Sequence, residues 1–489
     1  MSQQNFFGGN MSLNVVKSPK KKYDKTLVLL EEGKIKTQNI LSDGDKLLFD
    51  ALAKEKNFSG KKGEILEFAS LDGKTLSQFI FLGLGKEKEL TRESLKKNLF
   101  TAMKSLKGSI LLESTNKNFI DYDLIGELVE HTNYFFDKYY TKDKKEEDTK
   151  SLELDIVAEK SIPKLIEGVE LGKITNIVRN LVNEPSNVMT PQFLGENAKI
   201  LGKEYGVTVK VYDEKEIEKL KMGAFLAVAR ASANRPKLIV MKYNGDPKSK
   251  KNIALVGKGL CYDSGGLSIK PTDGMLTMHS DMTGGATVIG AICALAKMKI
   301  KKNVTAIVAA CENSISGDAY KPGDVITTMS GKTVEITNTD AEGRVTLADA
   351  LTYAIKKEKA DEIIDVATLT GAIIIALGEN ITGAFANNLD NYKKLEKAGV
   401  KWGEKYWHMP TDPEYRELIN SHIADIKNSA GKNGSSITAA KFLEEFVENT
   451  PWIHLDIAGT SFSRGSGKYY KKGATGIALK TLYEYVKNN

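Results

Sequence analysis

Cysteine and histidine are scarce in this chain of 489 residues, which contains only three cysteines and five histidines. Three cysteines in so long a chain do not make a disulfide scaffold, so a reducing cytoplasm is the simplest compartment. The His-Glu-x-x-His pattern is absent, which excludes the most familiar histidine-based zinc motif. No apolar run reaches the roughly 20 residues that cross a bilayer, so no membrane partner is expected.

An excess of charge of one sign is also missing. The chain has 70 Lys and Arg against 63 Asp and Glu, for a formal net charge of +7. Spread over this length, that excess favours a solvated, lysine-rich surface over a nucleic-acid-binding face. Nucleic-acid binding is therefore poorly supported, although it stays open as an alternative.

Alternating strand and helix patterns predict an α/β protein of two domains. Residues 1–158 are assigned to an N-terminal α/β domain, with residues 1–10 as a disordered leader because they lack an apolar signal-peptide core. An amphipathic helix is predicted within 159–182 as the connection. Residues 183–489 form the C-terminal domain.

In the N-terminal domain the last predicted helix covers Tyr122–Tyr140, with Phe135 facing inward. The C-terminal domain contains almost wholly apolar strands that alternate with helices, a pattern typical of a mostly parallel central sheet covered by helices on both faces. The clearest of these strands are Ile253–Val256, Val304–Ala309, Glu362–Ala367 and Trp452–Ile457.

An acidic turn with the sequence NTDAEGR covers Asn338–Arg344. A β-branched segment before it predicts a strand, and apolar residues at helical spacing after it predict a helix. The turn therefore lies at the carboxyl end of a strand, where α/β proteins place ligands. Asp340 and Glu342 stand at i and i+2, so an extended backbone would point both carboxylates the same way. Two carboxylates held so close need a cation between them.

A glycine-rich stretch, Val256–Asp281, supplies further ionisable groups. Its glycines let the backbone turn sharply and approach a ligand closely. With the acidic turn, it offers four carboxylates and two lysines, which are enough for two divalent metal ions with shared ligands. Any one carboxylate alone is more often a helix cap or a surface charge, so the prediction depends on the whole group. The groups in this stretch are Lys258, Asp263, Lys270 and Asp281.

These two stretches resemble the signatures of the leucyl aminopeptidase family, two-metal peptidases also called cytosol aminopeptidases. NTDAEGR is that family's most specific motif, and the spacing of the four groups in the glycine-rich stretch matches its pattern. Further matches are the segments NEPSN (183–187), TLTGA (368–372) and WIHLDIAG (452–459). The resemblance covers about residues 165–485; over the N-terminal part it is one of architecture only, a macro-like α/β domain used in assembly.

The resemblance implies two divalent ions per subunit, Mn²⁺ or Zn²⁺. Glu342 and Asp263 are the candidates to bridge both ions. Lys258 would bind through its neutral amine, which requires the metal charges to depress its pKa far below the usual value of about 10.4. The implied ligands are Lys258, Asp263, Asp281, Asp340 and Glu342.

The activity implied is that of a leucyl aminopeptidase, which releases Leu and other apolar residues from the amino end of peptides by attack of a metal-bridging hydroxide. Lys270 would stabilise the oxyanion. Arg344 would hold bicarbonate as the general base, helped by the backbone near Leu369, and a cytoplasmic homohexamer is expected. An apolar pocket for the leaving residue would include Met278, Thr368 and Gly371; for Met278, core packing is an equally good interpretation.

Three departures from the family pattern leave metal preference and pocket shape open. Cys261-Tyr262 replaces Thr-Phe, His279 replaces Arg, and Thr283 replaces Gly. We interpret Cys261 as a small buried side chain rather than a nucleophile. His454 and Asp456 look like a catalytic dyad, but no serine is placed against them, so structural hydrogen bonding is predicted.

Two other classes of function stay open. One is a two-metal phosphoesterase, although such sites usually include histidines and none is among the ligands proposed here. The other is a DNA-binding assembly protein, which the mild net charge supports little.

Overall fold

The computed structural model describes residues 13–19, 21–34, 40–72, 75–141, 151–157, 163–465 and 469–489. The chain divides into two compact units, residues 1–176 and 177–489. The division falls inside helix α5 (Pro163–Asn183), which overlaps the predicted connecting segment. The predicted leader, residues 1–10, lies outside the described residues.

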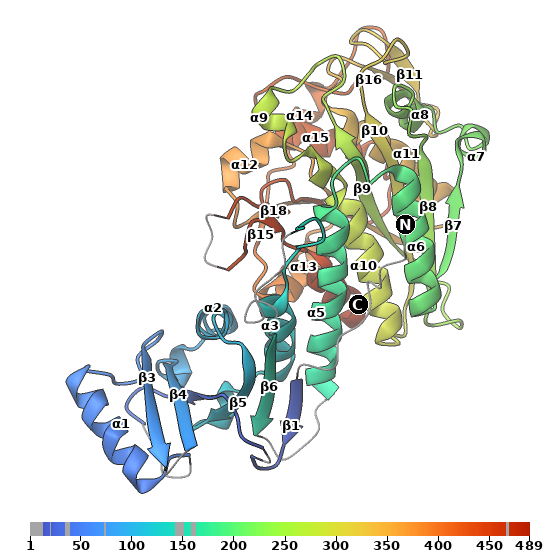
Figure 1. Cartoon of the computed structure of the whole chain (residues 1–489). Coiled ribbons are helices and arrows are strands. Elements are labelled where there is room, and N and C mark those ends of the chain that lie inside the picture. The colour runs from blue at the N-terminus through green and yellow to red at the C-terminus, as the bar shows by residue number, and fades with distance from the viewer. Residues whose placement is uncertain are drawn as a thin grey trace. The chain divides into compact units, whose positions relative to one another are not determined.

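The first unit is a six-stranded sheet with helices packed against it (Figure 1). Its elements are β1 (Leu13–Val16), β2 (Lys25–Leu30), α1 (Asp43–Glu55), β3 (Ile65–Asp72), β4 (Thr75–Gly83), α2 (Arg92–Met103), β5 (Gly108–Ser114), α3 (Tyr122–Asn133) and β6 (Leu152–Val157). The strand order is β1-β6-β5-β2-β4-β3, and only β3 and β4 pair antiparallel. Part of the core is aromatic: Phe49 of α1 packs against Phe81 of β4. The predicted α/β layer architecture is confirmed.

The predicted helix Tyr122–Tyr140 was wrong at its carboxyl end, because α3 stops at Asn133. The side chain of Asn133 both donates to and accepts from the backbone of Leu152, at 3.0 and 2.8 Å. This bond to a residue far along the chain fixes the helix end, and sequence periodicity cannot reveal it. Phe135 consequently lies outside the helix and is exposed rather than inward.

The second unit is built on an eight-stranded mixed sheet, with the order β15-β14-β17-β13-β9-β10-β8-β7. Four of its seven pairings are parallel, including the central run β17-β13-β9-β10. The mostly parallel sheet predicted from the apolar strands is therefore confirmed. Its strands are β7 (Thr208–Tyr212), β8 (Lys237–Asn244), β9 (Ile253–Asp263), β10 (Asn303–Asn313), β13 (Glu362–Ala367), β14 (Thr382–Ala386), β15 (Tyr406–His408) and β17 (Trp452–Asp456).

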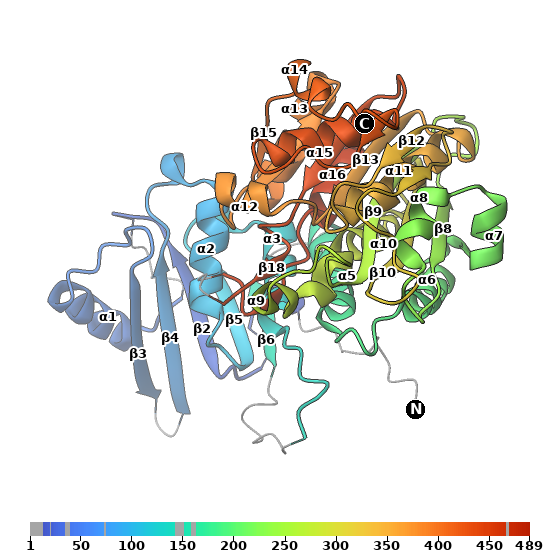
Figure 2. The same ribbon diagram turned by 90° about the horizontal axis from the view of Figure 1, so that it is seen from above.

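Helices cover both faces of this sheet (Figure 2). On one face, Gly257 of β9 lies so close to the start of α10 that a Cβ would meet Gly284 at 2.6 Å. On the other face, Val256 and Leu260 share a core with Leu347 and Leu351 of α11. The helices are α6 (Pro191–Tyr205), α7 (Glu214–Lys219), α8 (Gly223–Ala229), α9 (Thr272–Met275), α10 (Thr283–Lys297), α11 (Glu342–Lys356), α12 (Gly371–Leu377), α13 (Leu389–Trp402), α14 (Glu414–Glu417), α15 (Ser435–Glu444) and α16 (Leu479–Asn488). Within the described part of the chain, no helix has the length and apolar content that a membrane crossing needs.

The strand before the acidic turn does not belong to the central sheet. It is β12 (Thr333–Glu335), and it pairs with β11 (Val325–Thr327) and β16 (Ile426–Lys427) in a separate three-stranded sheet. The turn nevertheless follows the carboxyl end of a strand and precedes α11, as predicted, although that strand belongs to the small sheet rather than the central one. The carboxyl ends of β9, β10 and β13 carry the other parts of the site. A last small sheet joins β18 (Phe462–Ser463) to β19 (Gly473–Ala474).

Candidate metal centre

Lys258 lies in the middle of β9 with a side chain that is only 3% exposed. Its ammonium nitrogen lies 2.8 Å from Asp281 Oδ2 and 2.9 Å from Glu342 Oε1. It also donates to the carbonyl oxygen of Thr368 at 2.9 Å. The buried ammonium group of Lys258 thus joins three segments that lie far apart in the sequence.

A bulge in β9 brings Lys258 and Asp263 to the same side of the sheet. The two residues are five positions apart, so a regular strand would point them to opposite faces. The register against β10 shifts, however: Cys311 pairs with Leu260, and Glu312 pairs with Tyr262. Cys261 is the extra residue, and such a bulge re-aims the side chains beyond it.

Asp263 ends β9 and is almost fully buried. Its Oδ1 accepts hydrogen bonds from the backbone N–H of Gly265 and from Asn313 Nδ2, both at 2.9 Å. Its Oδ2 lies 2.8 Å from the ammonium group of Lys270, which also lies 2.5 Å from Asp340 Oδ1. One carboxylate oxygen is thus held by the protein, and the other faces the acidic turn.

The acidic turn is not extended. Asp340 lies in a turn and Glu342 is the first residue of α11, so the predicted i, i+2 alternation was the wrong geometry. The two side chains converge nevertheless: one ligand oxygen each from Asp263, Asp340 and Glu342 lie within 4.8 Å of one another. Gly265 makes this approach possible, because its φ is +85° and a Cβ would lie 2.8 Å from Asp340 Oδ1.

Burial and mutual repulsion weaken the acidity of the carboxylates. Burial raises the pKa of Glu342 to about 8, and the charge of Asp263 adds to the effect. Burial likewise raises the pKa of Asp281 to about 6, opposed by Lys258. Burial also raises the pKa of Asp340. Two ammonium groups do not balance four carboxylates, so additional positive charge at this site would favour their ionised forms.

The two lysines respond in the opposite direction. Burial lowers the pKa of Lys258, but Asp281 and Glu342 outweigh it and hold the pKa above its ordinary value. The same balance raises the pKa of Lys270. The carboxylates by themselves therefore stabilise the ammonium form of Lys258, and a metal ion would have to replace its proton, as the predicted neutral amine requires.

The donor set fits divalent cations. Among the described residues, Glu342 Oε2 has no hydrogen-bond donor although it is buried. A buried carboxylate oxygen without a donor is costly unless a cation occupies that side. Carboxylate oxygens with at most one amine nitrogen suit Mn²⁺ and can also hold Zn²⁺.

Arg344 lies two residues into α11 from Glu342 and is 6% exposed. Its Nη1 donates to the carbonyl oxygen of Asn428 at 2.9 Å, whereas its buried Nε has no acceptor within the described part of the chain. Burial lowers its pKa to about 10, which leaves the guanidinium charged at neutral pH. The guanidinium group is thus held by Asn428 through Nη1, and its other N–H donors are left for a small planar anion.

The TLTGA segment approaches the cluster through Thr368. Thr368 Oγ1 donates to Asp281 Oδ1 at 2.7 Å, and the Thr368 carbonyl oxygen accepts a hydrogen bond from Lys258 Nζ. The N–H of Leu369 donates to Asp456 Oδ1 at 3.1 Å, so this donor already has a protein acceptor. Gly371 begins α12 with open space where a Cβ would lie, and Met278 begins the 3₁₀ helix Met278–Met282 and is half-buried. Their assignment to a substrate pocket stays a prediction.

Sequence reasoning missed Asn313 and Asn428, and it predicted only structural hydrogen bonding for Asp456, without a contact to the site. Asn313 fixes Asp263, Asp456 fixes the TLTGA backbone, and Asn428 fixes Arg344. A weak signal existed for Asn313 and Asp456, since each is a polar residue at the end of an apolar strand. Asn428 lies after β16, and no pattern in the sequence marks it.

His454 and Asp456 do not form a dyad. His454 Nδ1 lies 2.6 Å from Asp365 Oδ1, whose other oxygen accepts from Trp452 Nε1 at 2.6 Å. All of these side chains are buried in the sheet. Cys261 is also fully buried, and burial raises the pKa of its thiol well above the ordinary value. The predictions of a structural histidine and a small buried cysteine fit these contacts.

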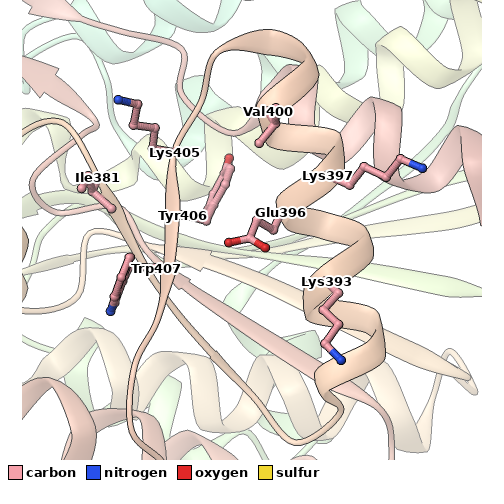
Figure 3. A pocket seen from close by; sticks show the side chains of 8 residues that line it. All are labelled: Ile381, Lys393, Glu396, Lys397, Val400, Lys405, Tyr406 and Trp407. Carbon is pink, nitrogen blue, oxygen red and sulfur yellow. The ribbon is translucent and has the colours of Figure 1, made fainter. Parts of the chain in front are cut away.

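A separate pocket of about 440 Å³ lies between α13 and β15 and contains none of the predicted site residues. Figure 3 shows Tyr406 and Glu396 between the helix and the strand, while Lys393 and Lys397 extend to one side, Lys405 extends to the other, and none of the three ammonium groups points into the space between. Because the cations do not converge, the pocket has no anion-binding geometry. Its lining residues are Ile381, Lys393, Glu396, Lys397, Val400, Lys405, Tyr406 and Trp407.

Residues 176–483 match the catalytic domain of the cytosol aminopeptidase family, and residues 21–143 match its N-terminal domain. The chain is 48% identical to a probable cytosol aminopeptidase of Fusobacterium nucleatum over 98% of its own length and 100% of the relative's. It is 47% identical to the corresponding protein of Clostridium tetani, over 94% and 98% of the two chains.

Two solved structures share the whole architecture. A tomato leucine aminopeptidase variant has a TM-score of 0.86 and 33% identity, covering 99% of this chain and 98% of that one. The bottromycin maturation enzyme BotP, solved in complex with Mn, has a TM-score of 0.83 and 27% identity, covering 96% and 99%.

Proposed function

Since the chain belongs to the cytosol aminopeptidase family and is therefore an aminopeptidase, we propose that it is a two-metal leucyl aminopeptidase that removes Leu and other apolar residues from peptides. The observation that carries this proposal is the convergence of Asp263, Asp340 and Glu342, whose ligand oxygens lie within 4.8 Å of one another. Lys258 and Asp281 adjoin this group and complete the proposed ligand set.

The proposed metals are Mn²⁺ or Zn²⁺, held by Lys258, Asp263, Asp281, Asp340 and Glu342. When bound, such ions would supply Lewis acidity, a site for the substrate's free amine and a bound water of lowered pKa. The need for a free amine would restrict the enzyme to the amino end of a peptide. The neighbouring Mn-bound structure supports trying Mn²⁺ first.

We assign oxyanion stabilisation and anion binding to two positively charged side chains, Lys270 and Arg344. Lys270 keeps its charge, and its ammonium lies between Asp263 and Asp340, where it can stabilise negative charge on the scissile carbonyl oxygen. Arg344 would hold bicarbonate with the donors that its bond to Asn428 leaves over. Met278, Thr368 and Gly371 are proposed to line the pocket for the leaving residue, and Leu369 to lie beside the anion.

We also propose a cytoplasmic homohexamer, on the resemblance to the family. Sedimentation of the purified protein would test the assembly, since a hexamer of this 53.7 kDa chain is readily distinguished from a monomer.

The alternative of a DNA-binding protein has its own test. A salt-dependent shift in the electrophoretic mobility of DNA that survives loss of metal binding would favour it.

The proposed function is tested with Asp340→Ala. We expect leucine anilide hydrolysis in Mn²⁺ to fall by roughly 10³-fold, because Lewis-acid stabilisation is worth several kcal/mol. Asp390→Ala is the control, since Asp390 is an exposed carboxylate on α13. Persistent hydrolysis by Asp340→Ala would mean that the site is wrongly placed. Hydrolysis of a phosphate ester in preference to leucine anilide would instead favour the phosphoesterase.

A further inference from the structure

Asn313 stands where the two ligand-bearing loops meet. It is the last residue of β10, pairs in register with Asp263 and is completely buried. This pairing exists only because of the bulge at Cys261; without the shift, Asn313 would face Tyr262. The bulge therefore serves two residues at once: it turns Asp263 toward Lys258 and brings it opposite Asn313.

Both amide hydrogens of Asn313 are used on this site. Its Nδ2 donates to Asp263 Oδ1 at 2.9 Å and to the carbonyl oxygen of Thr339 at 3.0 Å. Its backbone carbonyl accepts from the N–H of Ser264 at 3.0 Å. The first bond, with that from Gly265, occupies Oδ1 and leaves Asp263 Oδ2 facing the other ligands.

The second bond acts on the residue next to Asp340. The Thr339 carbonyl receives Tyr320 Oη at 2.8 Å as well as Asn313. The hydroxyl of Thr339 donates to the carbonyl of Gly265 at 2.7 Å and accepts from the N–H of Ser268 at 2.8 Å. The hydrogen bonds of Thr339 thereby join the acidic turn to the loop after β9, and the side chain of Asn313 contacts both Asp263, an implied ligand, and the Thr339 carbonyl.

We propose that Asn313 is a positioning residue that pre-orients Asp263 and the Asp340 turn so that the metal ligands converge before any ion binds. The proposal rests on the proposed function, because it assumes that these carboxylates bind metal. Loss of such a supporting hydrogen bond typically weakens metal affinity by about 10- to 100-fold, since the ligands must then be ordered by the ion itself.

Asn303 offers a matched control on the same strand. It begins β10, at the end opposite the site, and its Nδ2 donates to the carbonyls of Asp246 and Ser249, both at 2.9 Å. Asn303→Ala and Asn313→Ala therefore each remove one amide that ties a loop to β10. A purely structural role predicts that the two substitutions behave alike.

The test titrates the metal-stripped full chain with Mn²⁺ and follows free Mn²⁺ by electron paramagnetic resonance. We expect Asn313→Ala to raise the Mn²⁺ Kd by about 10- to 100-fold and Asn303→Ala to change it by less than about twofold. Melting curves of the metal-free proteins identify any general loss of folding. If Asn313→Ala does not fold, Asn313→Ser, which keeps one donor, should show a smaller increase in Kd.

Three results would overturn the inference, and only the third would also overturn the proposed function. A wild-type Kd for folded Asn313→Ala or Asn313→Ser, while wild type binds two Mn²⁺ and cleaves leucine anilide, would refute it alone. Equal weakening by Asn303→Ala would reduce Asn313 to a structural residue. Wild-type protein that binds neither Mn²⁺ nor Zn²⁺ would instead refute the proposed function, and the inference with it.

Discussion

Gly343→Ala tests whether the position of Lys258 matters. Gly343 is the second residue of α11, and a Cβ built there would lie 2.5 Å from Lys258 Cε and 2.7 Å from Nζ. Carbon atoms at contact stand about 3.5–4.0 Å apart, so the lysine tip must retreat by roughly 1 Å or more. Its contacts with Asp281, Glu342 and Thr368 are 2.8–2.9 Å long, and a shift of that size along any one of them lengthens it beyond hydrogen-bond distance.

The effect on stability should be small. Alanine in a helix is favoured over glycine by about 1 kcal/mol, whereas overpacking a well-filled site costs about 1–3 kcal/mol. The two contributions partly cancel, so the free energy of unfolding should change by less than about 2 kcal/mol. Activity should respond far more, because a misplacement of about 1 Å at a reacting centre can cost about 10²-fold.

The assay compares kcat/KM for leucine anilide and urea unfolding for Gly343→Ala and for Gly44→Ala. Gly44 is the second residue of α1, as Gly343 is of α11, but a Cβ there meets nothing within 4 Å. We expect Gly44→Ala to keep full activity and Gly343→Ala to lose about 10²-fold while it still unfolds cooperatively. Wild-type kcat/KM in Gly343→Ala would refute the reasoning that Lys258 must hold this position.

Two further predictions concern the anion site and the metal ions. Arg344→Lys should lower kcat by about 10²-fold while Mn²⁺ content stays unchanged, because an ammonium group cannot reproduce the forked guanidinium that bonds both Asn428 and an anion. Loss of metal, measured by atomic absorption, would show that the role of Arg344 was misassigned. Removing metal with a chelator should abolish activity, and Mn²⁺ at 100 times its Kd should restore it and add about 2.7 kcal/mol to the free energy of unfolding. Full activity of metal-free protein would contradict the proposed function.

Much of the second unit could be predicted from local pattern. Strand β13 coincides with the predicted Glu362–Ala367, because a continuous apolar run is a local signal. The candidate ligands were also found from residue type, glycine content and motif, which do not depend on the fold. The helix end at Asn133 was missed, since it depends on a bond to Leu152.

The sequence by itself determined which side chains could bind a cation: it holds a carboxylate-rich turn, a glycine-rich loop and few histidines, and these are chemical facts of composition. The tertiary structure decided how they meet. A single extra residue, Cys261, reverses the alternation of β9 and places Asp263 beside Lys258, while β12 lies in a separate sheet. Register and long-range hydrogen bonds such as those of Asn313 arise only when distant strands pair, so periodicity along one segment carries no record of them.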